Sequence, residues 1–158
     1  MMRSSCFLAV PLIVAISAAP AAAAPRGSFA PFAGSWSGSG QVVSATGSEA
    51  IRCRARSDVG AGGASISQRL VCASASYRFD ITCRADDADG RISGTWTETT
   101  RGVTGMLTGE LQAGQMRGVV SSPLFNAGLS LVTRGNRQDV VIAPEGNDVR
   151  QVSVQLRR

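Results

Sequence analysis

The sequence contains no histidine and no lysine, so all 16 of its basic residues are arginines. Without histidine, the chain lacks the usual general base and the commonest metal ligand. This absence excludes a Ser-His-Asp or Cys-His catalytic system and a histidine-ligated zinc site. No two carboxylates stand at a spacing typical of paired acid–base catalysis. We therefore expect a protein that is not an enzyme, with no catalytic residues, no metal site and no cofactor.

Long apolar runs are also missing, since none reaches the ~20 residues of a membrane-spanning helix. The longest run, residues 7–19, follows Arg3 and precedes a tract of small residues. That order is typical of a secretory signal peptide, and we assign it to residues 1–23. We expect an exported protein, periplasmic or secreted, without a membrane span. An irregular lead-in at residues 24–31 would precede a single domain at residues 32–158.

A period of two runs through the rest of the chain, with turn residues every eight to twelve positions or so. No segment keeps a helical period over three turns. This pattern predicts an all-β fold, an antiparallel up-and-down meander of about 8–10 strands. Inward positions mix glycine with large residues, and open sheet edges invite aggregation. Both points favour closure into a barrel; the alternative is a two-sheet sandwich.

The segment "EAIRCRARSD" (49–58) places Arg52, Arg54 and Arg56 on alternate positions. The residues between them are apolar, so strand geometry predicts that the arginines face solvent. A net charge of +5 would favour weak attraction to anionic partners. A genome rich in G and C would produce the same excess of arginine over lysine.

Three cysteines, Cys53, Cys72 and Cys83, follow the predicted signal peptide. A hairpin centred on "GAGG" (60–63) places Cys53 opposite Cys72 on the inward face, which predicts a disulfide in an exported protein. The next hairpin places Cys83 opposite residue 67 or 68, away from Cys72. We therefore predict that Cys83 is a buried free thiol.

Five inward positions are candidates for ligand binding: Trp36, Tyr77, Phe79, Trp96 and Glu98. Each tryptophan follows a glycine closely and could either plug the end of a barrel or line a cavity. Glu98 shares the parity of Trp96, so its carboxylate could orient a ligand or act as an acid near the mouth. A loss of alternation at the strand end would explain it equally well.

The segment "ADDADGR" (85–91) has the aspartates of a calcium loop in part. Ala85 occupies the first ligand position, and Trp96 stands where the closing glutamate should be. A hairpin turn at Asp-Gly explains the segment without an ion.

Two resemblances rest on specific segments. Gly34-Ser35-Trp36 resembles the Gly-x-Trp start of lipocalins and their calycin relatives. That resemblance implies a barrel able to hold an apolar ligand, with Arg134 or Arg150 packed over Trp36; some bacterial relatives are periplasmic protease inhibitors. The chain also resembles a group of small secreted alphaproteobacterial proteins of unknown function, which implies Cys53 and Cys72 as shared cysteines, Cys83 as an extra, and no activity. Its segments are "FAGSWSGSG", "IRCRA", "LVCASASYRFD", "SGTWTETTRGVTG", "LSLVTRGN" and "DVRQVSV".

The leading functional hypothesis is a non-enzymatic exported barrel that binds a small apolar molecule or an envelope partner. The alternative is a protein-binding module, such as a periplasmic inhibitor, that uses its loops or the face of Arg52, Arg54 and Arg56. We expect no specific recognition of nucleic acid. The sequence predicts no oligomeric state.

Overall fold

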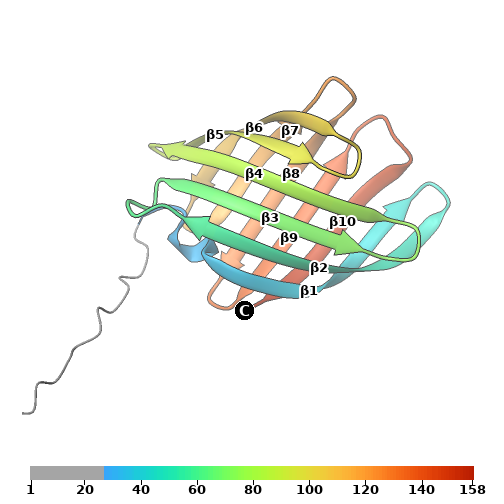
Figure 1. The fold of residues 1–158 in the computed structure, drawn as a ribbon, viewed down its shortest axis with the longest axis horizontal. Coiled ribbons are helices and arrows are strands. Elements are labelled where there is room, and N and C mark those ends of the chain that lie inside the picture. Colours follow the sequence, from blue (N-terminus) through green and yellow to red (C-terminus); the bar gives the residue numbers. More distant parts are fainter. Residues whose placement is uncertain (1–26) are drawn as a thin grey trace, which may run out of the picture.

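The computed structural model describes residues 27–158, so the predicted signal peptide (1–23) lies outside the described residues. One 3-10 helix and ten strands make up the described part (Figure 1). They are η1 (Ala30–Phe32), β1 (Gly34–Ser44), β2 (Gly47–Val59), β3 (Ser65–Ala73), β4 (Arg78–Ala88), β5 (Arg91–Glu98), β6 (Val103–Gln112), β7 (Gln115–Ser121), β8 (Asn126–Arg134), β9 (Arg137–Pro144) and β10 (Val149–Arg157).

The strands form one closed antiparallel barrel in which each strand pairs with its neighbours in sequence and β1 pairs with β10. This confirms the all-β up-and-down meander, and the closed barrel replaces the sandwich alternative. Within residues 27–158, no helix has the length and apolar character needed to cross a bilayer.

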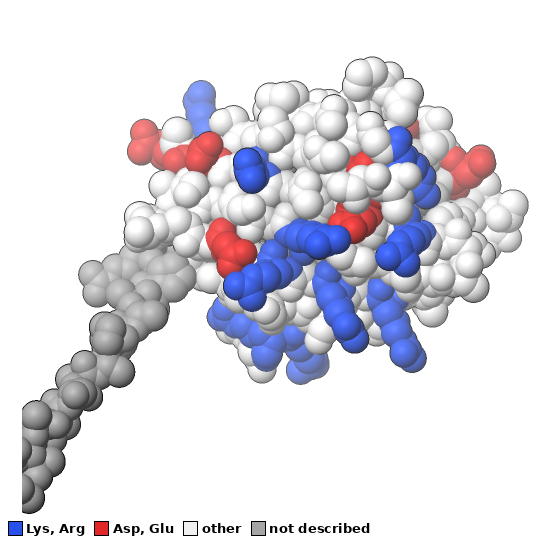
Figure 2. Space-filling model, in the orientation of Figure 1, with Lys and Arg blue, Asp and Glu red and all other residues white. Residues whose placement is uncertain are grey.

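Strand β2 shows why the period of two gives this fold. Ile51, Cys53 and Ala55 are buried, and every intervening residue, Arg52, Arg54 and Arg56 included, is exposed. Successive side chains on a strand point to opposite faces, so one face enters the core and the other meets water. Figure 2 shows basic side chains projecting from the part of the surface where β1 and β2 lie.

Two glycines allow β1 to close on β10. A Cβ on Gly38 would collide with the carbonyl oxygen of Gln155, and a Cβ on Gly40 with that of Ser153. The backbones approach closely here because no side chain separates them.

The residues before β1 seal one end of the barrel. Phe29 and Phe32 are fully buried, with ring centroids 6.2 Å apart in an edge-to-face arrangement. The Phe29 N–H donates to the Gly63 carbonyl at 3.0 Å, which ties this segment to the β2–β3 loop. The lead-in (24–31) was expected to be irregular; its last two residues belong to the single turn of η1, which continues to Phe32, and the turn acts as a plug.

Trp36 belongs to this closed end. Its Nε1–H donates to the Phe32 carbonyl at 2.9 Å, and the guanidinium of Arg158 lies 4.6 Å from its ring centroid. Arg158 also donates to the carbonyl of Gly135 at 3.2 Å. The lipocalin resemblance implied Arg134 or Arg150 at this place; that prediction is wrong, because the guanidinium over the indole belongs to Arg158.

The cysteines follow the predicted register. Cys53 and Cys72 lie directly opposite each other on β2 and β3 and form a disulfide, with Cα atoms 4.1 Å apart. Cys83 lies opposite Gln68 and makes no disulfide with a described residue. Burial raises the pKa of its thiol to about 11, so the thiolate is scarce at neutral pH.

The "ADDADGR" segment is the β4–β5 hairpin. Asp89 and Gly90 both have positive φ, 54° and 84°, as the central residues of a tight hairpin turn require. The Gly90 N–H donates to the Asp87 carboxylate at 2.8 Å. The turn therefore accounts for these residues, as predicted.

Candidate functional site

The end of the barrel opposite η1 opens into a cavity of about 520 Å³. Loops between β3 and β4, β5 and β6, β7 and β8, and β9 and β10 surround the opening, and residues from all four contribute to its wall. Deeper in, the wall is apolar. Among the inner lining residues are Leu70, Ile81, Val140, Ile142, Val152 and Val154.

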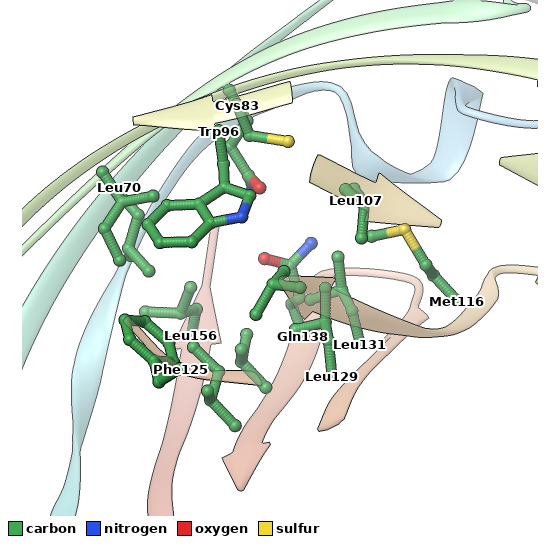
Figure 3. Close-up of a pocket in the computed structure, with 15 residues that line it drawn as sticks. Leu70, Cys83, Trp96, Leu107, Met116, Phe125, Leu129, Leu131, Gln138 and Leu156 are labelled. Atoms are coloured by element: carbon green, nitrogen blue, oxygen red, sulfur yellow. The ribbon is translucent and has the colours of Figure 1, made fainter. Parts of the chain in front are cut away.

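A second, smaller chamber of about 140 Å³ lies further inside the barrel (Figure 3). Leu70, Ile81, Trp96, Phe125, Val140 and Ile142 line both spaces, which places the chamber next to the mouth. Trp96 and Phe125 contact each other at this junction, with ring centroids 5.7 Å apart and planes tilted by 46°. The two rings therefore lie at the junction of mouth and chamber.

The five predicted interior residues separate into two groups. Tyr77, Phe79, Trp96 and Glu98 all line the mouth, where Tyr77 and Phe79 stack with centroids 6.1 Å apart. Trp36 lines neither space, because it packs at the closed end. The two tryptophans therefore have different structural roles: Trp36 belongs to the plug, and Trp96 forms part of the cavity wall.

Trp96 is held in one orientation. Its Nε1–H donates to the Met106 carbonyl at 3.2 Å, and it lies against Gly105 on the neighbouring strand. A Cβ on Gly105 would come within 2.7 Å of Nε1. The glycine therefore provides the space that the indole fills.

The Glu98 carboxylate is occupied by donors from its own hairpin loop and from Asp80 on β4. It accepts hydrogen bonds from the N–H groups of Asp80 (3.1 Å), Thr100 (3.2 Å) and Arg101 (2.8 Å), and from the Thr100 hydroxyl. Burial disfavours ionisation, but these hydrogen bonds outweigh it, so the pKa of Glu98 is held below its usual value. An ionised carboxylate that accepts so many bonds anchors the β5–β6 loop; it is poorly suited to donate a proton.

Arg101 extends this anchored loop over the rim. Its guanidinium lies 3.4 Å from the Glu98 carboxylate, donates to the Arg78 carbonyl at 3.2 Å, and lies 5.4 Å from the Phe79 ring centroid. The rim thus carries a positive group whose charge Glu98 largely balances, directly above aromatic side chains.

Phe125, Leu124 and Gln138 are among the site residues that were not predicted from the sequence. Phe125 and Leu124 lie in the β7–β8 loop, where no periodic pattern places a side chain; Leu124 is 74% exposed at the rim. Gln138 is fully buried in the wall of the deep chamber. A signal for Gln138 was present, because it shares parity with Val140 and Ile142 on β9, but a glutamine is normally expected on the solvent face.

A scan against protein-family models and searches of curated proteins and of solved structures found no match to the chain. The site is therefore interpreted from the residues of this chain and their geometry.

Proposed function

We propose that the protein binds a small apolar molecule inside its barrel and does not convert it chemically. The observation that carries this proposal is the open cavity of about 520 Å³, a size within the ~300–1,000 Å³ range of small-molecule sites. A ligand that enters would displace water from this apolar wall into bulk solvent, and that release favours binding.

The rim supports a ligand with an apolar body. Tyr77, Phe79 and Leu124 offer apolar surface at the opening, while Arg101, Asn147 and Asp148 supply polar groups there. A few polar groups around an apolar pocket are the usual arrangement for orienting a small ligand. We place this activity outside the cytoplasm, where the Cys53–Cys72 disulfide would persist.

A cavity-blocking variant tests the proposal. Titration with N-phenyl-1-naphthylamine, a neutral dye that brightens in apolar surroundings, should show saturable binding of one dye per chain. Ile142→Trp puts an indole into the wall shared by mouth and chamber and should lower the dye affinity by roughly tenfold or more. Val119→Trp is the matched control, because Val119 is 48% exposed on the outer face.

The two variants give opposite expectations only if the dye binds inside. Equal loss or equal retention of dye binding in both variants would contradict the proposal. Thermal melts of both variants should accompany the titration, so that a loss of binding is not confused with a loss of fold.

The arginine face supports a second candidate function, docking of an acidic protein partner. Arg52 and Arg54 are exposed and have no carboxylate within ion-pair distance in the described part of the chain, whereas Arg56 pairs with Asp58 at 3.1 Å. Arg157 on β10 extends this arginine face. Ser37 on β1 pairs with Arg54 on one side and with Arg157 on the other. Figure 2 shows this concentration of positive charge.

Salt dependence tests this second candidate. Binding of poly-glutamate should weaken steeply from low to high salt and should drop further in an Arg52→Gln/Arg54→Gln variant. If poly-glutamate binding changes neither with salt nor with the two substitutions, the arginine face is not the binding surface.

A further inference from the structure

Two amide side chains, Gln68 and Gln138, interrupt the apolar lining of the deep chamber. Gln68 donates from Nε2 to the Ser57 hydroxyl at 3.0 Å, and Gln138 is the fully buried one. Gln138 lies between Thr133 of β8 and Leu156 of β10 in the strand register. Its Nε2 donates to the Thr133 hydroxyl at 3.0 Å, which holds the amide in place. Its Oε1 has no hydrogen-bond partner among the described residues, although the side chain is fully buried.

The unpartnered oxygen faces a space large enough to hold part of a ligand. Figure 3 shows the Gln138 amide among apolar side chains, with its oxygen directed toward the side of the chamber where Trp96 lies. A buried acceptor left without a donor destabilises the folded protein, and such groups are uncommon in native interiors. A donor delivered by a ligand would recover that loss on binding.

We propose that the deep chamber receives the hydroxyl end of an apolar alcohol or phenol, whose O–H donates to Gln138 Oε1. The inference rests on the proposed function and names the ligand class for the same cavity. The ligand enters with its hydroxyl first, and its apolar body then occupies the mouth between Trp96 and the rim.

A carboxylate, an aldehyde and an ether each suit this chamber less well than a hydroxyl group. No charged side chain is among the residues that line it, so a carboxylate would be buried without a counterion and would face an amide oxygen. An aldehyde or an ether has no proton to donate. Arg101, the cation of the site, lines the mouth and not the chamber.

Four probes of similar length separate these possibilities: 1-octanol, heptyl methyl ether, octanal and octanoate. Their dissociation constants would be measured by calorimetry for the wild-type protein and for Gln138→Leu, which keeps a similar shape and removes the amide. The alcohol and the ether lose different amounts of hydration on binding, so their affinities cannot be compared directly. The informative quantity is a quotient: the octanol-to-ether affinity ratio of the wild type, divided by the same ratio measured for the variant. We expect this quotient to be roughly ten.

The ether serves as the internal standard for the cavity itself. It should bind wild type and Gln138→Leu with similar affinity, whether or not the inference about Gln138 holds. A quotient near one, whether octanol is compared with the ether or with octanal, overturns the inference and leaves the proposed function standing. Failure of both octanol and ether to bind wild type overturns the inference and the proposed function together.

A second variant guards against a change in folding. Gln138→Leu leaves the Thr133 hydroxyl without its partner, and Thr133→Val/Gln138→Leu removes both members of the pair. Replacing both partners with apolar groups of the same shape is expected to be nearly neutral for stability. The double variant should therefore melt near the wild-type temperature and show the same loss of alcohol preference as the single variant.

Discussion

Removal of the Cys53–Cys72 disulfide should lower the stability of the barrel by a calculable amount. The bond joins residues 19 apart in sequence and closes a loop within the β2–β3 hairpin. In the chain-entropy treatment, a loop of about 20 residues contributes roughly 3 kcal/mol at 25 °C by restricting the unfolded chain. Reduction of the wild-type protein leaves both side chains in place, so it isolates this contribution.

The same figure predicts a shift in melting temperature. With roughly 2.1 cal/mol/K of unfolding entropy per residue, a domain of about 130 residues has roughly 0.27 kcal/mol/K in total. A loss of about 3 kcal/mol then lowers Tm by about 10 °C. Thermal melts followed by circular dichroism, with and without reductant, would measure it. Cys83→Ala is the control, because it breaks no bridge and the reductant-induced shift should persist in it unchanged.

Thiol titration checks the pairing behind this calculation. In a protein that begins at residue 24, and so lacks Cys6, a chromogenic thiol reagent should find one reactive group per chain in denaturant and three after reduction, because Cys83 is the one free cysteine among the described residues. A shift in Tm below about 2 °C on reduction would refute the chain-entropy reasoning. A peptide map with a Cys72–Cys83 bridge would refute the strand register itself.

Three further predictions concern the two ends of the barrel. Because the pKa of Glu98 is lower in the folded protein than in the unfolded chain, its ionised carboxylate stabilises the fold. This stabilisation is complete above the unfolded pKa of ~4.3 and is lost as the pH falls through the folded pKa. Glu98→Gln should therefore flatten that part of the stability-versus-pH curve in urea melts. Arg158→Ala removes the cation over the closed-end indole and should cost about 1 kcal/mol in the same melts; an unchanged midpoint would contradict this. Gly105→Ala should cost about 1–3 kcal/mol by overpacking and should weaken dye binding by displacing Trp96, whereas Gly128→Ala, which has open space around it, should do neither.

The alternation of side chains was sufficient to predict the strands and their order. In β2 the apolar and arginine positions separate without exception around Cys53, and a pairing slip of one residue would have buried the guanidinium groups. The same constraint made Cys53–Cys72 predictable, because one hairpin turn sets which residues face each other. Local pattern and register are properties of neighbouring residues, so they can be read along the chain.

The site was predicted only in part, for a reason that Trp36 and Trp96 illustrate. Both occupy inward positions in similar Gly-[Ser/Thr]-Trp-[Ser/Thr] segments, yet one is covered by Phe32 and Arg158 and the other borders a cavity. Parity shows that a side chain points inward. It does not show how far along the barrel axis the side chain lies or which other segments fill the space beside it.

The sequence by itself therefore determined an all-β meander, its register at the disulfide, and an outer face rich in arginine, since each depends on residues adjacent in the chain or across one turn. Only the tertiary structure decided which end of the barrel is sealed and that Glu98 anchors a loop. It also placed Gln138 with an unpartnered oxygen inside an apolar chamber. These features arise where β1 closes on β10 and where segments distant in sequence meet, and the free space left between them depends on all of the surrounding side chains together.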